Sequence, residues 1–476
     1  MSTDRRSFLK ISGLAGLGFL SGCKQKSGAQ QKKYALPEIK KQAAEKHQSV
    51  FNMSGYGAPK MEEVRIGFVG VGNRGSAAVE RMSRIEGVAI QGICDVRPEI
   101  AEKAKKRITS EGHEAKLYSD GEEAWKNLCD REDVDLIYIA THWAKHAEMA
   151  VYAMEHGKHV AVEVPAATTV EDCWRLVTTS EETKKHCVIL ENCCYDFFEL
   201  LTLNLARQGF FGDIVHCGGA YLHPIMDSFF EEDKRYDFWR LKENALHNGN
   251  LYPTHGLGPV AQILKINRGN RMEYLSSMSS KDFSLKPKAE EVAKEDARFK
   301  KYLGQSFRGN INVTNIMLEN GSTVMLQHDV SSPRPYSRLH IVSGTKAYAQ
   351  KYPLPAKIAI GEEDFLKEEA MKQLEEENTP AIIKKIGELA RQVGGHGGMD
   401  FMMDWRLIDC LRNGLPVDMD VYDAAAWSVI TPLSEWSVAN KAQPIEVPDF
   451  TMGRWKENKE HDINLEHGGS TRVHQA

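Results

Sequence analysis

The sequence predicts an α/β protein with two folded domains. From Val64 to about residue 193, short apolar runs typical of buried strands alternate with helical patterns, which indicates a doubly wound parallel sheet. After Asp196 the apolar residues alternate with a period of two, which indicates an α+β domain with an open, mainly antiparallel sheet. A chain of 476 residues is long enough to form both cores.

The first domain is predicted to be a regular series of strands and helices. Short apolar runs predict strands at Val64–Val69, Ala89–Cys94, Asp135–Ala140 and His159–Val162. Helical patterns fill the intervals over residues 76–85, over residues 98–110 with Pro98 near the start, and up to His156-Gly157.

The second domain is predicted to begin with a helix that ends at Gln208. Strands are then expected at Asp213–Tyr221, Asn310–Glu319, Ser322–Val330 and Ser337–Val342. The turn Glu319-Asn320-Gly321 predicts a hairpin, because Asn-Gly favours the tight turn between paired strands. Charged helical stretches near residues 288–303 and 361–392 are expected to be surface insertions.

The N-terminal segment carries two processing signals. Arg5-Arg6 precedes a short apolar run, which is typical of a twin-arginine export signal, and Leu20-Ser21-Gly22-Cys23 is typical of a lipoprotein cleavage and acylation site. The apolar run Ile11–Leu20 is too short to cross a bilayer. We therefore expect export by the twin-arginine route and a lipid anchor at Cys23 in the cell envelope, facing the periplasm.

These patterns divide the chain into five segments. They are a twin-arginine/lipoprotein signal at 1–23, a tether at 24–60, a first domain at 61–193, a second domain at 194–447 and an extended C-terminal arm at 448–476. The formal net charge of −5 gives no reason to expect a nucleic-acid partner. Nine cysteines occur without a Cys-x-x-Cys pair, so we expect neither a structural disulfide nor a metal site. The oligomeric state stays open, and a homo-oligomer is compatible with the sequence.

A glycine fingerprint lies between the first strand and the first helix. Gly70 permits a tight turn, Gly72 lets the backbone approach a pyrophosphate, and Gly75 lets helix and strand pack closely. Asn73 and Arg74 lie at the helix N-terminus, where phosphates bind. Asp95 ends the second strand, where a carboxylate binds ribose hydroxyls and disfavours a 2′-phosphate. The first domain is therefore predicted to be a Rossmann dinucleotide-binding domain for NAD.

The export signal and the NAD fingerprint make opposing demands. An exported dehydrogenase would need its cofactor replaced or reoxidised at every turnover, outside the soluble cofactor pool of the cytoplasm. A protein that is exported folded, with NAD bound, avoids this problem if the hydride returns to the substrate in each cycle. The combination therefore favours chemistry with no net oxidation.

Two further motifs resemble a known family. Thr141-His142-Trp143-Ala144-Lys145-His146 and Glu163-Val164-Pro165 follow consecutive predicted strands, as in the glucose–fructose oxidoreductase / inositol dehydrogenase family. The resemblance covers residues from about 64 to 440. In that family the second motif is normally Glu-Lys-Pro, and its lysine serves proton transfer beside the nicotinamide. Val164 stands here instead and cannot transfer a proton, so the sequence argues against alcohol dehydrogenation by that lysine.

Longer strings resemble one branch of that family, glycoside hydrolase family 109, the NAD-dependent α-N-acetylgalactosaminidases. They are Leu190–Asp196, Phe238-Trp239-Arg240, Asn250–Pro259 and Gly394–Asp400. The resemblance implies that the sugar site is lined by Tyr221, Arg240, Tyr252, Pro253, Thr254, His255 and Tyr336. It also implies that NAD is approached by Asn73, Arg74, Asp95, Trp143, His146, Glu163, Val164 and Asn192, with Arg240 and Tyr252 reaching both ligands.

The residues themselves also suggest roles. Tyr252-Pro253-Thr254-His255 is turn-like and is followed by Gly-Leu-Gly, so we expect irregular backbone that presents a phenol and an imidazole. Two prolines before Tyr336 place it at a sheet edge or in a loop. His255 and Tyr336 are the candidates for proton transfer. His396, among four glycines, is consistent equally with a mobile lid and with a hinge.

The expected function is hydrolysis of terminal α-linked N-acetylgalactosamine. It would proceed through transient oxidation of C3 by tightly bound, recycled NAD, deprotonation at C2 and elimination, an exception to two-carboxylate hydrolysis. One alternative is a net NAD-dependent sugar or cyclitol oxidoreductase of the same superfamily. Another is a sugar-binding lipoprotein that contains NAD and catalyses no turnover.

Overall fold

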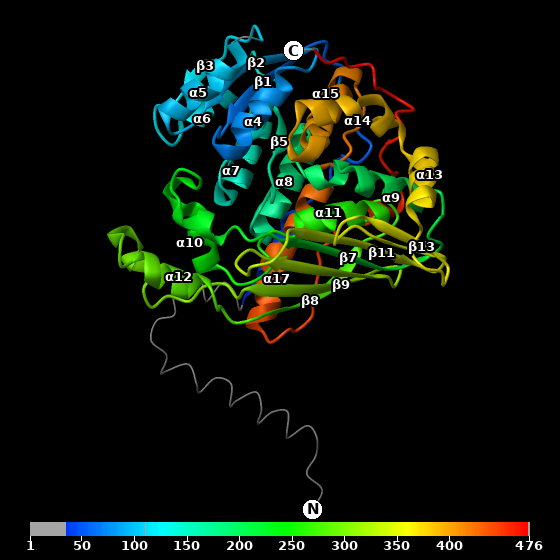
Figure 1. Cartoon of the computed structure of the whole chain (residues 1–476). Helices are drawn as coiled ribbons and strands as arrows, with labels where there is room; N and C mark the ends of the chain where they lie inside the picture. Colours follow the sequence, from blue (N-terminus) through cyan, green and yellow to red (C-terminus); the bar gives the residue numbers. More distant parts are fainter. Residues whose placement is uncertain (1–34, 110, 475–476) are drawn as a thin grey trace, which may run out of the picture.

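The structure is a computed structural model that describes residues 35–109 and 111–474. The chain forms a parallel α/β half and a half built on a large mixed sheet, which pack against each other (Figure 1). The predicted export signal and Cys23 lie outside the described residues. No helix in the described ranges combines the length and the apolar character that crossing a bilayer requires.

The N-terminal half contains a six-stranded parallel sheet in the order β3-β2-β1-β4-β5-β6. Its strands are β1 (Val64–Val69), β2 (Val88–Cys94), β3 (Lys116–Tyr118), β4 (Leu136–Ile139), β5 (His159–Val162) and β6 (Cys187–Ile189). The accompanying helices are α4 (Asn73–Met82), α5 (Pro98–Thr109), α6 (Ala124–Cys129), α7 (Trp143–Glu155) and α8 (Val170–Thr183). The predicted doubly wound sheet is confirmed, although α4 begins at Asn73, directly after the fingerprint turn, rather than at residue 76.

The C-terminal half contains an eight-stranded sheet in the order β13-β12-β11-β7-β10-β9-β8-β14. Its strands are β7 (Ile214–Leu222), β8 (Met272–Ser279), β9 (Ile311–Leu318), β10 (Thr323–Asp329), β11 (Ser337–Gly344), β12 (Ala347–Gln350), β13 (Lys357–Ile360) and β14 (Ile445–Glu446). β7 and β10 run parallel, and the other neighbours are antiparallel. The mainly antiparallel sheet is therefore confirmed, including the β9–β10 hairpin at Asn320-Gly321.

Two helices lie between this sheet and the N-terminal half, α9 (Phe197–Arg207) and α11 (Thr254–Ile263) (Figure 1). The expectation of irregular backbone after His255 is wrong, because α11 continues through Gly256, Gly258 and Pro259. The glycines serve packing. A Cβ on Gly256 would lie 2.4 Å from the Ala220 backbone nitrogen, and one on Gly219 would lie 2.2 Å from the Gly256 carbonyl oxygen. Helix α11 therefore lies on β7 at a distance that only glycine permits.

The chain returns to the parallel sheet near its C-terminus. α15 (Met399–Asn413) packs against α4 and β1, and α16 (Val421–Ser428) packs against α8 and β6. The helices that connect or flank these segments are α10 (Trp239–Leu246), α12 (Leu285–Val292), α13 (Glu368–Asn378), α14 (Ala381–Val393) and α17 (Ile430–Ala439). Residues 361–392 were expected to form a surface insertion. Helix α13 fits this expectation because it has no buried residues. Helix α14 does not, because it buries Ile382, Ile386 and Ala390 beside α15.

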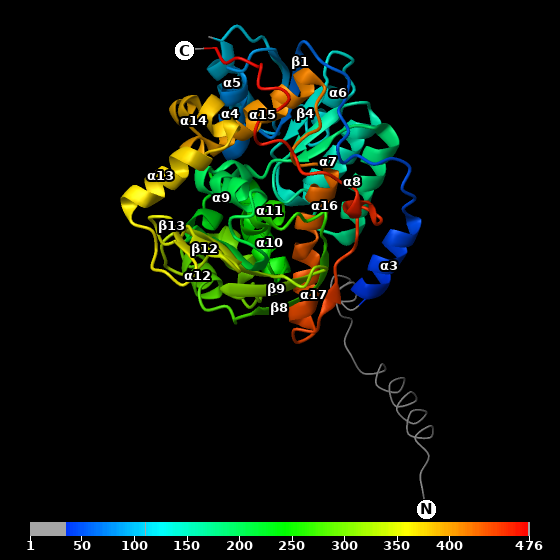
Figure 2. The ribbon, with the colours of Figure 1, turned by 90° about the vertical axis from the view of Figure 1, so that its right-hand side faces the viewer.

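The expectation of a tether over residues 24–60 is wrong from residue 35 onward. Helix α3 (Leu36–Lys46) packs against α8, as Figure 2 shows, and Met53 is buried. The imidazole of His47 contacts Thr178 Oγ1 at 2.8 Å, and the Glu181 carboxylate accepts a hydrogen bond from the Val50 amide. Polar composition concealed these contacts. The expected extended arm at 448–476 contains turns and the short 3-10 helix η6 (Arg454–Lys456), and it ends beside the N-terminal half, where Val473 pairs with Ile85.

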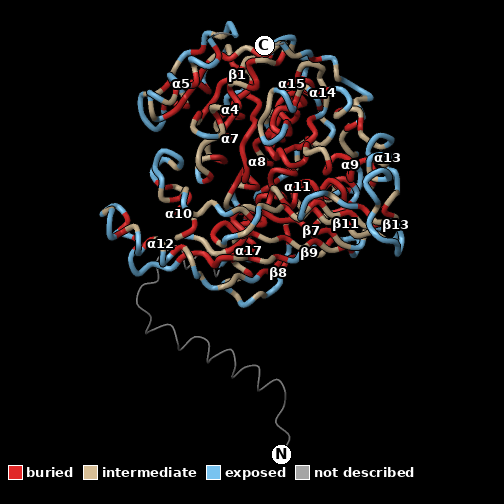
Figure 3. The backbone as a smooth tube through the Cα atoms, in the orientation of Figure 1, coloured by how far each residue is buried: buried red, intermediate tan, exposed pale blue. Residues whose placement is uncertain are grey.

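Buried residues run continuously from the parallel sheet through α8 and α11 to β7 (Figure 3). A second apolar cluster lies beside it and includes Tyr221, Phe229, Phe238 and Val330. The eight cysteines in the described part of the chain are all buried as free thiols. The functional residues described below lie where the two halves meet.

Candidate functional site

The glycine fingerprint has the geometry that a dinucleotide requires. Gly70 adopts φ +82°, and a Cβ on Gly75 would lie 1.9 Å from the Gly70 carbonyl oxygen. The Asp95 carboxylate lies at the end of β2, accepts a hydrogen bond from the Val71 amide at 3.0 Å and is paired with Arg97. The tight turn and the carboxylate at the strand end fit the pyrophosphate and ribose of NAD.

Arg74, at the start of α4, connects the two halves of the protein. Its guanidinium forms ion pairs of 2.9 Å with Glu163, which follows β5, and of 3.0 Å with Asp400 on α15. Burial by itself lowers the pKa of Arg74, but Glu163 and Asp400 raise it well above its ordinary value. Asn192 also donates to Asp400. Three of the predicted cofactor residues, Arg74, Glu163 and Asn192, therefore belong to one network.

His146 and Val164 lie near the network around Arg74, but neither belongs to it. Both imidazole nitrogens of His146 face carbonyl oxygens, that of Pro165 at 2.8 Å and that of Thr141 at 3.1 Å. Burial lowers the pKa of this histidine, so it is neutral and donates to one carbonyl at a time. Val164 is buried, and its side chain cannot supply a proton. His146 therefore stabilises the segment after β5.

An aromatic box with an arginine lies beside the cofactor region. The ring of Trp143 stacks on that of Tyr252 with 5.6 Å between centroids, and the rings of Tyr252 and Tyr221 are 4.7 Å apart. The Arg240 guanidinium lies 5.0 Å from the centroid of Trp143 and 5.1 Å from that of Tyr252. Its Nε and Nη2 are buried and have no hydrogen-bond partner among the described residues. Such donors, next to aromatic faces, suit the hydroxyls and ring of a sugar.

His255 lies at the second position of α11 and is held by a carboxylate. Its Nδ1 is 2.7 Å from Glu191 Oε1 and 2.9 Å from Oε2. Glu191 follows β6, is fully buried and also accepts the Cys193 amide at 3.0 Å. Burial acts to raise the pKa of Glu191, but His255 holds it below its ordinary value. Pro253 and Thr254 form the start of α11, and Thr254 is buried.

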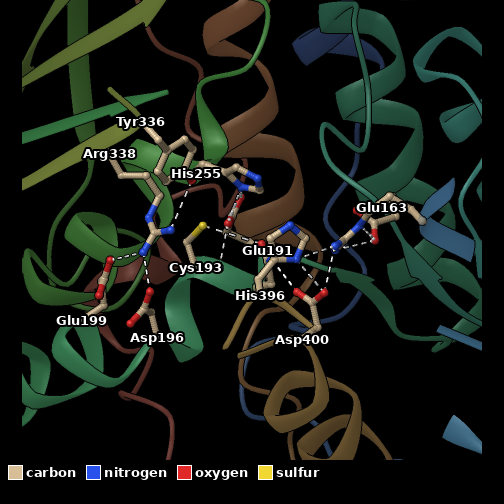
Figure 4. A network of polar contacts seen from close by, with 12 residues as sticks. Glu163, Glu191, Cys193, Asp196, Glu199, His255, Tyr336, Arg338, His396 and Asp400 are labelled. Atoms are coloured by element: carbon tan, nitrogen blue, oxygen red, sulfur yellow. Dashed lines mark hydrogen bonds and ion pairs between the residues drawn. The ribbon is translucent and has the colours of Figure 1, made fainter. Parts of the chain in front are cut away.

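Tyr336 lies in the loop before β11 and is held by a positive charge instead. Arg338 Nη1 donates to the Tyr336 hydroxyl at 3.2 Å. Burial raises the pKa of Tyr336, and Arg338 acts in the opposite direction. Arg338 pairs with Asp196 and Glu199 (Figure 4), so the guanidinium is fixed. Lys351 pairs with the same two carboxylates. Tyr221 contacts both catalytic candidates, with ring centroids 5.3 Å from His255 and 6.3 Å from Tyr336.

His396 belongs to the network around Arg74. Its Nδ1 is 2.8 Å from Asp400 Oδ2 (Figure 4) and 3.2 Å from Arg74 Nη1. The backbone has positive φ at five consecutive residues, from Gly394 (φ 93°) to Gly398 (φ 106°), with His396 at φ 47°. The side chain is 58% exposed. The glycines thus allow a tight, left-handed segment to carry an exposed imidazole to the edge of the cofactor region.

Sequence reasoning missed the residues that hold the functional side chains. Glu191 and Asp400 lie within the segments Leu190–Asp196 and Gly394–Asp400 that resemble the family, but nothing in the pattern indicates which histidine each contacts. Arg338 lies two residues after Tyr336, a spacing that places both side chains on one face of an extended segment and could have suggested the pair.

The potential ligand atoms of Glu191, Cys193 and His255 also lie within 4.8 Å of one another. The sequence predicted no metal site, yet the fold brings three side chains of metal-binding type together. The short Glu191–His255 contact explains this grouping without an ion, because the two groups are hydrogen-bonded directly.

Two family models match the chain. Residues 64–191 match "Oxidoreductase family, NAD-binding Rossmann fold", and residues 195–457 match "Glycosyl hydrolase 109, C-terminal domain". The first match agrees with the fingerprint geometry, so the N-terminal half is an NAD-binding domain. The second match covers Tyr221, Arg240 and Tyr252 of the aromatic box, the His255 helix and the Tyr336 loop.

Similar proteins cover nearly the whole chain. A glycosyl hydrolase family 109 protein 1 of Bacteroides thetaiotaomicron is 43% identical over 467 residues, which cover 94% of this chain and 97% of the relative. A protein of Bacteroides fragilis named alpha-N-acetylgalactosaminidase is 48% identical over 411 residues, covering 84% of this chain and 95% of the relative.

Solved structures share the two-domain fold at low identity. A levoglucosan dehydrogenase in complex with NADH and levoglucosan has a TM-score of 0.62 at 19% identity, covering 81% of this chain and all of the other. A scyllo-inositol dehydrogenase from Lactobacillus casei, with bound NAD(H) and scyllo-inositol, has a TM-score of 0.56 at 15% identity, covering 81% of this chain and 99% of the other. These likenesses show the fold.

Proposed function

Because the chain belongs to glycosyl hydrolase family 109, we propose that it hydrolyses terminal α-linked N-acetylgalactosamine with the help of bound NAD. The observation that carries the proposal is that the carboxylates of this region all have basic partners. Glu163, Glu191, Asp196, Glu199 and Asp400 each contact an arginine, lysine or histidine. No two of these carboxylates form a free acid–base pair of the kind that direct glycoside displacement uses.

The proposed mechanism works by activation of C2. When bound, NAD supplies a reversible hydride acceptor for C3 of the sugar. With C3 as a ketone, the C2 proton becomes acidic, a base removes it, and the C1–O bond breaks by elimination. Water then adds at C1, the proton returns to C2, and C3 is restored to an alcohol, so net redox change is zero.

The residues of this chain divide the work between binding and proton transfer. Arg240 offers its unpartnered N–H groups to the sugar hydroxyls, and the rings of Tyr221 and Tyr252 bound the sugar. His255 and Tyr336 transfer protons, since each is fixed by an ionic partner and both border Tyr221. Val164 leaves the cofactor region without the lysine that alcohol dehydrogenation requires.

The proposal includes the location of the enzyme. The Arg5-Arg6 signal and Leu20-Ser21-Gly22-Cys23 support export by the twin-arginine route and a lipid anchor at Cys23, on the periplasmic side of the envelope. The protein would bind NAD before export and keep it. Fractionation of cells that express Cys23→Ser tests the anchor, because the substituted protein should leave the membrane fraction.

The proposed activity is tested by purification without added cofactor, followed by assay with a chromogenic α-N-acetylgalactosaminide. Hydrolysis with near-stoichiometric NAD(H), released on denaturation, is expected. Net accumulation of NADH during turnover would identify an oxidoreductase instead, and binding of the sugar with no product would identify a sugar-binding lipoprotein. Activity that requires repeated addition of NAD would contradict recycling.

A further inference from the structure

We infer that Glu191 is a positioning residue that fixes the tautomer of His255, so that Nε2 of His255 is the atom that accepts a proton during turnover. The inference deepens the proposed function and rests on it, because His255 is placed there as a proton-transfer group. It adds what the sequence does not reveal, namely which nitrogen acts and which residue prepares it.

The geometry of the contact determines the tautomer. Both oxygens of Glu191 lie within hydrogen-bond distance of Nδ1, at 2.7 Å and 2.9 Å. An ionised carboxylate only accepts hydrogen bonds, so Nδ1 must carry the proton that it donates. In the neutral imidazole the remaining nitrogen, Nε2, then holds the free electron pair. The carboxylate thus selects the basic atom.

Burial makes this selection rigid. Glu191 has no exposed surface, and the Cys193 amide at 3.0 Å holds one of its oxygens in place. The His255 side chain is 12% exposed, so the ring has limited access to the surroundings. A buried carboxylate that loses its partner is costly, which means that the pair persists in the folded protein.

Two aromatic side chains border the imidazole ring. Tyr221 and Tyr252 contact the imidazole edge-on, with centroids 5.3 Å and 4.8 Å away. Burial raises the pKa values of the neighbouring Cys193 and Cys194 thiols and of the Tyr221 and Tyr252 phenols, and it lowers the pKa of His223. These groups are therefore neutral near pH 7, whereas the Glu191 carboxylate contacts His255 directly.

The proton balance of the step is complete within the pair. A proton leaves the substrate with its bonding electrons remaining there, and it binds Nε2. The resulting imidazolium carries one positive charge, which the Glu191 carboxylate offsets at Nδ1. When Nε2 returns the proton, the pair regains its starting state. No other oxidant or base is needed for this transfer.

The test is a double-mutant cycle with a matched control. Glu191→Gln keeps the side-chain size. Because the Cys193 amide donates to Oε1, the glutamine oxygen is expected at that position and its NH2 group then faces Nδ1, which favours the tautomer with the proton on Nε2. We expect kcat to fall by about 10²-fold or more, with KM changed by less than about threefold, because ground-state contacts with the sugar remain. Glu181→Gln is the control, since Glu181 is also buried and lies 3.8 Å from a histidine, His47, outside the site. Its kcat should match that of the parent protein.

The cycle is completed by His255→Ala and the double variant Glu191→Gln/His255→Ala. If Glu191 acts through His255, the double variant should be no slower than His255→Ala alone within about threefold. Additive losses, or a Glu191→Gln enzyme with kcat within about threefold of the parent, would overturn the inference. Retention of bound NAD by each variant distinguishes a catalytic loss from a failure to fold.

Two further measurements keep the outcomes separate. Metal analysis of the purified protein and dialysis against a chelator test the Glu191–Cys193–His255 grouping as an ion site, and a stoichiometric ion whose removal abolishes activity would contradict the tautomer assignment. If the parent protein hydrolyses no α-N-acetylgalactosaminide, the proposed function fails. The cycle can then be measured from the NADH absorbance band with any sugar that the protein oxidises, so the two failures are distinguishable.

Discussion

The proposed site has a cofactor half and a sugar half, and the two are built in different ways. The cofactor half depends on backbone: Gly70, Gly72 and Gly75 lie within six residues of one another, and the carboxylate of Asp95 hydrogen-bonds back to the amide of Val71. The sugar half depends on side chains from separate elements, among them β7, α10, α11 and the loop before β11. A local motif therefore specifies the first, whereas the second exists only after the sheet and α11 have packed together.

The two proton-transfer candidates extend this contrast within the sugar half. His255 is held by the negative charge of Glu191, and Tyr336 is held by the positive charge of Arg338. The two partners also differ in hydrogen-bond role, since Glu191 accepts a hydrogen bond at Nδ1 of His255 and Arg338 donates one to the Tyr336 hydroxyl. Both partners are themselves buried, so the charges are weakly screened.

The largest effect is expected in the sugar half. His255→Ala and Tyr336→Phe should each reduce turnover by about 10²-fold or more while NAD stays bound, since they remove proton transfer and leave the fingerprint intact. Turnover in heavy water should place deuterium at C2 of the released sugar, as read by NMR. If C2 shows neither exchange nor a rate effect with C2-deuterated substrate, the elimination mechanism is wrong and a carboxylate must be sought.

Acid should lower the stability of the N-terminal and C-terminal halves of the protein alike. Burial lowers the pKa of His186, beside the parallel sheet, to about 4, and it lowers the pKa of His340, in β11, to about 4. Each histidine therefore binds fewer protons folded than unfolded, and stability should fall as the pH drops from about 6.5 to about 4, by roughly 1 kcal/mol or more per group. Denaturant titrations across this range measure the loss. The variant His340→Gln should show a shallower pH dependence, and an unchanged one would refute this origin.

A smaller and more specific effect is expected in the cofactor half. Asp95→Ala should weaken NAD retention roughly tenfold to a hundredfold, because hydrogen bonds to a charged group contribute about 1.5–3 kcal/mol each. The folded state should change less, since Asp95 lies at the end of a strand. Cofactor occupancy after gel filtration provides the measurement. Full occupancy in the variant would contradict the position given to the ribose.

The smallest effect is expected outside both halves. Glu376→Gln on α13 should change stability by less than about 0.5 kcal/mol and leave kcat unchanged, because α13 has no buried residues. The result would separate the carboxylate cluster at 375–377 from catalysis. A substantial loss of turnover would instead reopen the two-carboxylate alternative.

The contrast between local motifs and long-range packing also explains how much of the fold and of the site the sequence predicts. The parallel sheet, the fingerprint and the β9–β10 hairpin follow from local patterns, and they occur where expected. Helix α11 does not, because propensity opposes a helix through Gly256, Gly258 and Pro259 while packing on β7 requires small residues. Helix α3 and the partner Glu191 were missed because their contacts join residues distant in sequence. Arg338 and Asp400 lie only two and four residues from Tyr336 and His396, but the contacts that fix them, with Glu199 and with Arg74, are distant in sequence.

The return of α15 and α16 to the parallel sheet has a consequence for biosynthesis. Residues near 400–428 cover α4, β1, α8 and β6, so a ribosome must release most of the chain before the N-terminal half can bury its apolar faces. The NAD-binding domain therefore cannot mature as the first product of vectorial synthesis. Nascent chains halted before α15 should therefore bind chaperones.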